Sequence, residues 1–126
     1  MAWKAYNPNP SGRNVGDCAV RAVAKALDLS WDAAYVLIAN AGYQLSDMPS
    51  SNAVWGSVLR RKGFERKSLP DSCPDCYTAG DFCEDHPTGL YVLGFGTHVA
   101  TVENGTIYDS WDSSNEIPQY YWKKEC

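Results

Sequence analysis

The segment CAVRAVAKAL, residues 18–27, constrains the fold of this chain more than any other stretch. Its apolar residues occupy almost every side of a helix, and only Arg21 and Lys25 interrupt them. A helix that is apolar nearly all round is a buried one, so other elements must pack around it. The sequence therefore predicts a central helix near the N-terminus, capped by the side chain of Asp17.

Two more helices are expected after this one. Ser30 is a typical N-cap for a helix from Trp31 to about Asn40, which Gly42 ends. A third helix is expected from about Asn52 to Lys62, with Gly63 as its stop.

Beyond residue 63 the hydrophobic period changes from that of a helix to that of a strand. Four segments are expected to be strands: 64–69, 89–95, 97–103 and 105–111. Asn104-Gly105 is a strong hairpin signal that joins the last two, whereas residues 1–16 are expected to be irregular. Helices followed by hairpin-linked strands predict an α+β fold, with N-terminal helices packed on a small antiparallel sheet.

Length and charge restrict the domain organisation and the partners. A chain of 126 residues is expected to form a single domain over 1–126. A net charge of −4 and a pI near 5.0 argue against nucleic acid as a partner, which calls for a basic face. The sequence also contains no apolar run of membrane-spanning length and no signal-peptide pattern, so we expect no membrane partner and a cytoplasmic location. The oligomeric state is left open.

Three residues have the types and positions needed for thiol catalysis. Cys18 lies at the expected start of a helix, where unpaired N–H groups and the helix dipole favour a thiolate. In a two-residue hairpin at 104–105, Asp109 becomes a diagonal, same-face neighbour of His98, while Trp111 lies opposite it. The sequence therefore predicts that His98 acts as a base and that Asp109 orients it. Each residue taken alone is more often an ordinary packing or surface residue.

The order of these residues resembles the papain-like cysteine peptidase superfamily. GDCAVRAVAKAL together with GTHVATVENGTIYDSWD is similar to its small phage- and prophage-type members. The resemblance implies a papain-like fold in which Cys18 is the nucleophile, His98 the general base and Asp109 the orienting acid. It also implies a peptide or protein substrate, no cofactor for catalysis and, for a phage protein, a place in the host cytoplasm.

One departure from that superfamily concerns the oxyanion hole. Its members usually carry a Gln several residues before the cysteine, and this chain has no Gln upstream of Cys18. Asn14, four residues earlier, offers the same amide chemistry, so we expect it to be the donor. Loss of one such donor typically costs about 10²–10³ in rate.

The segment CPDCYTAGDFCEDH, within an insert at 70–88, predicts a second site. Its four zinc-type ligands, two of them in a C-x2-C pair, suit a tetrahedral structural zinc: Cys73, Cys76, Cys83 and His86. A short helix starting after Thr78, whose hydroxyl can cap it in a capping box with Asp81 three residues on, places the last two on one face. The alternative is that His86 belongs to an ordinary helix stop and that these cysteines pack or lie at the surface. Cys126 is expected to be a free thiol.

Three functions follow from these patterns. The first is a cysteine hydrolase or acyl transferase that cuts peptides, isopeptides or amides, with Trp31, Trp55 and Trp111 lining its cleft. The second is a catalytically inactive papain-like module that binds a peptide or a host protein, an idea supported by the missing Gln. The third is a zinc-stapled interaction domain in which Cys18 belongs to the core.

Overall fold

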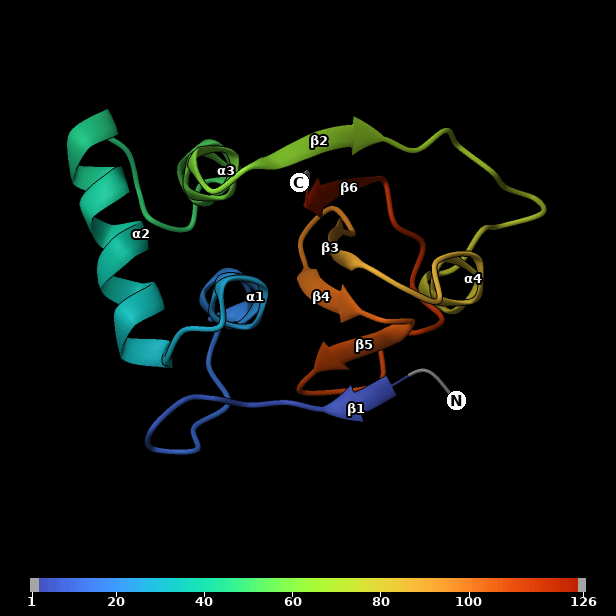
Figure 1. Cartoon of the computed structure of the whole chain (residues 1–126), viewed down its shortest axis with the longest axis horizontal. Coiled ribbons are helices and arrows are strands. Elements are labelled where there is room, and N and C mark those ends of the chain that lie inside the picture. Colours follow the sequence, from blue (N-terminus) through green and yellow to red (C-terminus); the bar gives the residue numbers. More distant parts are fainter. Residues whose placement is uncertain (1–2, 125–126) are drawn as a thin grey trace.

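The computed structural model describes residues 3–124 and contains one six-stranded sheet with helices on both of its faces (Figure 1). In chain order the elements are β1 (Trp3–Ala5), α1 (Cys18–Leu27), α2 (Trp31–Leu45), α3 (Asn52–Arg61), β2 (Phe64–Ser68), α4 (Ala79–Asp85), β3 (Leu90–Gly94), β4 (Val99–Glu103), β5 (Thr106–Asp109) and β6 (Tyr120–Lys124). The strand order is β1-β5-β4-β3-β6-β2. This arrangement confirms the α+β class.

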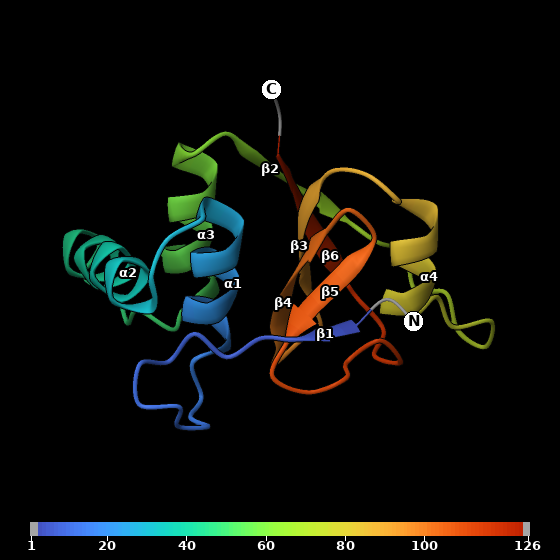
Figure 2. The ribbon, with the colours of Figure 1, turned by 60° about the horizontal axis from the view of Figure 1, so that its bottom comes forward.

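The sheet separates two apolar clusters. On one face α1 packs against β4, with α2 and α3 beside it, and on the other face lies α4 (Figure 2). The larger cluster joins the three N-terminal helices to the sheet, and the smaller one joins α4 to the opposite face. Because both faces are covered, β3 and β4 are buried along almost their whole length.

The central helix agrees with the prediction. Residues Ala22, Val23 and Ala24 of α1 are each at most 2 % exposed. Buried Thr101 of β4 donates a hydrogen bond from its hydroxyl to the carbonyl of Ala22 at 2.7 Å, which ties α1 to the middle of the sheet. The N-terminus of α1, where Cys18 lies, is thereby fixed relative to β4.

Two details of the helices differ from the prediction. Helix α2 continues to Leu45 because Ser46, with φ of 54°, provides the left-handed cap expected at Gly42. Gly42 instead allows a close approach: a Cβ there would lie 2.8 Å from the carbonyl oxygen of Asp47. Asp17 precedes α1 but makes no side-chain cap hydrogen bond.

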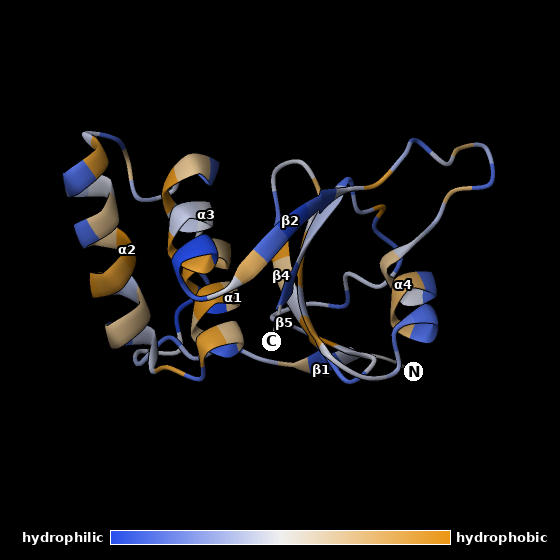
Figure 3. Cartoon of the chain, turned by 45° about the horizontal axis from the view of Figure 1, so that its top comes forward, coloured by the Kyte–Doolittle hydropathy of each residue, from blue (hydrophilic) through white to orange (hydrophobic). Residues whose placement is uncertain are grey.

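The sheet is mixed rather than purely antiparallel. Strand β1, within the segment expected to be irregular, pairs in parallel with β5. Strand β6, which the periodicity did not reveal, lies between β3 and β2. Both pair with strands that are distant in the sequence, so no local pattern predicts them. Strand β2 is left at the edge and is largely hydrophilic (Figure 3), as exposed edge strands usually are.

The hairpin between β4 and β5 has the predicted register. Asn104 and Gly105 both have positive φ, 50° and 77°, as a type I′ turn requires. Glu103 pairs with Thr106, and Val102 pairs with Ile107, as predicted. This register determines which side chains at the far end of the hairpin share a face.

Within the described part of the chain, no helix is long and apolar enough to cross a membrane.

Candidate active site

Cys18 is the first residue of α1, and its side chain is half-buried. Backbone N–H groups in the first turn of a helix have no intrahelical acceptor, and no acidic residue occupies that turn here. The backbone N–H of Val99, at the start of β4, donates to the sulfur. The thiol thus lies where α1 meets the sheet, among donors that favour its anion.

His98 directly precedes β4 and faces the thiol of Cys18. The loop before it turns through Gly96, with φ of 90°, and closes with a hydrogen bond from the Phe95 N–H to the His98 carbonyl at 2.8 Å. The ring of Trp111, which lies beyond the end of β5, is 5.1 Å from the imidazole, centroid to centroid. His98 is therefore held by its loop and by an aromatic neighbour.

Asp109 ends β5 and is 1 % exposed. Its Oδ2 lies 2.6 Å from Nε2 of His98 and also accepts a hydrogen bond from the Ser113 hydroxyl at 2.6 Å. Its Oδ1 accepts a hydrogen bond from the Ser110 N–H at 2.8 Å. Because Nε2 is occupied by the carboxylate, Nδ1 of His98 is the nitrogen left to hydrogen-bond with Cys18. The structure thus brings the three predicted residues together.

The charges of this group reinforce one another. Burial opposes ionisation of Cys18, but hydrogen bonds from His98 and Val99, with the charges of His98 and Arg21, lower the pKa of the thiol. Burial likewise disfavours a charged His98, yet Asp109 and Cys18 raise the pKa of the imidazole to about 9. Burial raises the pKa of Asp109, but hydrogen bonds from His98 and Ser113 outweigh it and lower that pKa. Each of these shifts favours the charged form of its own group, so the arrangement moves the site toward a thiolate–imidazolium pair.

A buried ion network of Asp17, Arg21 and Asp109 adjoins His98 and Cys18. Arg21 of α1 donates to the carboxylate of Asp17, and its second terminal nitrogen lies 3.4 Å from Oδ1 of Asp109. Asp17 also accepts a hydrogen bond from the indole N–H of Trp31 at 2.8 Å, which explains why it does not cap α1. Sequence reasoning missed this role for Arg21, although a lone arginine in an otherwise apolar buried helix was the available signal.

A pocket of about 330 Å³ opens beside the thiol, lined by Cys18 and His98 together with Asn52 and Trp55 of α3. Asn14 is exposed and is not among its lining residues. Asn52 accepts a hydrogen bond on Oδ1 from the indole N–H of Trp55 at 3.1 Å, which leaves its NH₂ group free to donate. Asn52 thus places an amide in the pocket that Cys18 lines, and no sequence pattern linked it to Cys18.

The three tryptophans expected to line the cleft occupy different positions. Trp55 lines the pocket at Cys18, and Trp111 contacts His98 and is 44 % exposed. Trp31 lines a separate, mainly apolar pocket of about 320 Å³, where it stacks on Tyr35. That pocket shares Gly16, Ala19 and Ser50 with the one at Cys18. The surface on this side of the thiol is therefore suited to an apolar group.

The four predicted zinc ligands do not form a cluster. Cys73 and Cys76 are joined by a disulfide, so their sulfurs are not the thiolates that zinc requires. Cys83 is buried, which raises the pKa of its thiol to about 11, and Nδ1 of His86 is 2.8 Å from the Phe82 carbonyl. No group of three or more candidate metal ligands occurs within residues 3–124. The zinc site stays a prediction, which metal analysis of the reduced protein tests.

The short helix predicted within the insert is present. Helix α4 begins after Thr78, whose hydroxyl accepts from the Asp81 N–H while the Asp81 carboxylate accepts from the Thr78 N–H. The predicted capping box is therefore confirmed. The prediction for Cys126 lies outside the described residues.

Comparison with protein-family models, with curated proteins and with solved structures finds no match to this chain.

Proposed function

We propose that this protein is a papain-like cysteine hydrolase, a peptidase, isopeptidase or amidase, with Cys18, His98 and Asp109 as its triad. The observation that carries the proposal is that Cys18, at the N-terminus of α1, faces His98, whose Nε2 lies 2.6 Å from the carboxylate of buried Asp109. A thiolate nucleophile, a base within hydrogen-bond reach and a group that orients the base are what acyl transfer requires.

In the proposed reaction, Sγ of Cys18 attacks the carbonyl carbon of an amide, and the electron pair of the C=O bond moves to oxygen. The carbonyl then reforms, the C–N bond breaks, and the imidazolium of His98 gives its proton to the leaving amine. Water attacks the resulting thioester while His98 accepts a proton from it. The C–S bond then breaks, the carboxylic acid departs, and the thiolate of Cys18 is regenerated beside the imidazolium. The balance is one amide and one water converted to one acid and one amine.

The oxyanion needs donors at the point where its charge develops. The backbone N–H of Cys18 lies in the first turn of α1, and the free amide NH₂ of Asn52 lines the same pocket. We therefore assign the second donor to Asn52, while the role predicted for Asn14 has no support from its position. Asn52→Ala should lower kcat about 10²–10³-fold, and the matched Asn14→Ala should leave it unchanged. The reverse result would return the role to Asn14.

Thiol reactivity tests the nucleophile directly. We expect iodoacetamide at pH 6 to alkylate Cys18 at least about tenfold faster in the wild type than in His98→Ala, because the imidazolium maintains the thiolate. Buried Cys83, whose pKa is raised, is an internal control that should stay unmodified. Equal rates in the two proteins would contradict the ion pair.

Turnover then separates an enzyme from an inactive module. Fluorogenic peptide amides and ε-amino-linked isopeptides should be hydrolysed by the wild type and not by Cys18→Ala. A reactive Cys18 that turns over neither class of amide would favour the binding module that the absent upstream Gln suggests.

A further inference from the structure

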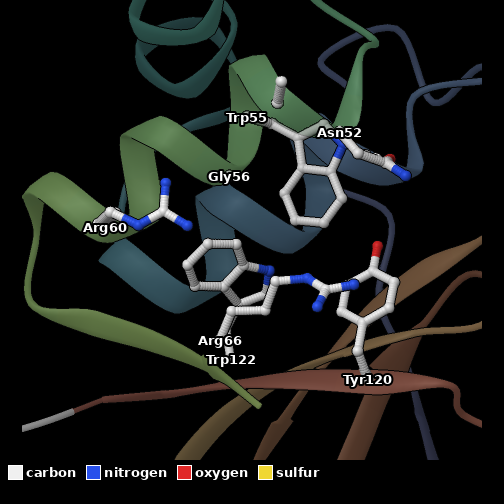
Figure 4. A pocket seen from close by; sticks show the side chains of 8 residues that line it. Asn52, Trp55, Gly56, Arg60, Arg66, Tyr120 and Trp122 are labelled. Atoms are coloured by element: carbon white, nitrogen blue, oxygen red, sulfur yellow. Dashed lines mark hydrogen bonds between the residues drawn. The ribbon is translucent and has the colours of Figure 1, made fainter. Parts of the chain in front are cut away.

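A second pocket, of about 290 Å³, adjoins the one at Cys18 and differs from it in charge. Asn52 and Trp55 line both pockets, so the two lie side by side along α3. Its other walls include Arg60 of α3, Arg66 of β2 and two aromatic residues of β6 (Figure 4). No acidic side chain lines it.

Each of the two arginines lies over an aromatic ring of β6. The guanidinium of Arg60 lies 5.1 Å from the ring centroid of Trp122, and that of Arg66 lies 4.1 Å from the ring centroid of Tyr120. Stacking fixes a guanidinium by its face and leaves the N–H groups at its edge available. Within residues 3–124 neither arginine pairs with a carboxylate. Two pre-positioned cations therefore border one cavity without an anion.

The wall of the pocket also holds an unused donor. Trp122 is 3 % exposed, and its indole N–H has no hydrogen-bond partner among the described residues. A buried donor without an acceptor is unusual in a folded protein. This N–H is itself buried, so the groups that line the pocket and can meet a ligand directly are the two unpaired arginines.

Tyr120 links this pocket to the nucleophile. Burial raises the pKa of its phenol and Arg66 lowers it, while the negative charge of Cys18 raises it further. Tyr120 thus lies within electrostatic reach of both the arginine and the thiolate. Because Asn52 and Trp55 line both pockets, an occupant of this one would lie next to the pocket at Cys18.

We infer that this pocket binds a carboxylate of the substrate next to the scissile bond, an inference that rests on the proposed hydrolase function. Arginine edges match the two oxygens of a carboxylate, and the protein's net charge of −4 means that the attraction must be local. The carboxylate belongs either to an Asp or Glu side chain or to a free C-terminus. Those two sources share the same recognition chemistry.

Binding is best measured in Cys18→Ala, which removes turnover. The probes are N-acetyl-glutamate N-methylamide, its neutral glutamine counterpart, and N-acetylglycine for a free α-carboxylate. The readout is the Trp122 indole N–H signal in ¹⁵N-labelled protein, assigned by its loss in Trp122→Phe. We expect a saturable shift with at least one carboxylate probe, and a dissociation constant at least about threefold lower than for the glutamine probe.

The arginine variants show whether the guanidinium groups are responsible. Arg60→Gln/Arg66→Gln should abolish the preference for the carboxylate, and 0.5 M NaCl should weaken it. Arg61→Gln is the matched control, because Arg61 is outside the pocket and contacts Gln44. No saturable shift with either carboxylate, an equal response to the glutamine probe, or a preference that survives the double variant would overturn the inference.

These outcomes remain separate from the test of the hydrolase itself. A wild type that hydrolyses neutral amides while Cys18→Ala ignores both carboxylates would overturn the pocket and leave the proposed function intact. Carboxylate binding with an unreactive Cys18 would overturn the hydrolase, and with it the assignment of the bound carboxylate to a scissile substrate.

Discussion

The protonation of His98 depends chiefly on one buried carboxylate. The pKa of His98 is raised from 6.5 to about 9, which corresponds to roughly 3 kcal/mol in favour of the imidazolium at 1.36 kcal/mol per pKa unit. Burial works against this charge, so Asp109 at 2.6 Å supplies the largest favourable contribution. Asp109→Asn keeps the shape and removes the charge, and it should lower the pKa of His98 by about 1–3 pKa units.

Proton NMR titration of the imidazole signals measures this change, and the chain has only two histidines to assign. His86 lies outside the site and serves as a reference within each sample. Asp112→Asn is the matched control, because Asp112 is nearby in sequence and accepts hydrogen bonds from Ser114. A wild-type pKa near 6.5 for His98, or the same value in wild type and Asp109→Asn, would refute the reasoning.

Three further predictions concern stability. In Cys18→Ala no thiol ionises at the site, and the free energy of unfolding should fall as pH rises above 6.5. The reason is that the folded state holds a proton on His98 that the unfolded state releases. Equal urea midpoints at pH 6 and pH 9 would contradict this. Arg21→Met leaves two buried carboxylates without their cation and should cost about 3–5 kcal/mol by urea denaturation, whereas a loss below about 1 kcal/mol would show that the network is dispensable. Gly94→Ala places a Cβ inside the ring position of Tyr120 and should lower stability by about 1–3 kcal/mol, an effect that a thermal midpoint equal to that of the wild type would disprove.

The parts of the fold that follow local rules were predictable. The all-round apolar pattern of residues 18–27 gave the central helix with its bounds, and Asn104-Gly105 gave the hairpin with its register. That register predicted that Asp109 lies beside His98, because side chains alternate strictly along paired strands, and the 2.6 Å contact confirms it. Strands β1 and β6 were missed because each is defined by a distant partner rather than by its own pattern.

Within the site, the same division holds between local and long-range information. A carboxylate before a helix looks like a cap in sequence, but burial beside Arg21 and Trp31 turned Asp17 into part of an ion network. Asn52 is 34 residues beyond Cys18 in numbering, so only the packing of α3 beside α1 brings its amide to the thiol pocket.

The sequence by itself determined the central helix, the hairpin and the pairing of imidazole with carboxylate, because short-range periodicity and turn chemistry fix them. Tertiary structure alone decided that the thiol meets that pair, that its pocket is completed by α3, and that two arginines border the adjoining cavity. The physical reason is that these contacts join side chains from elements whose relative placement depends on how the whole core packs, which no window of the sequence encodes.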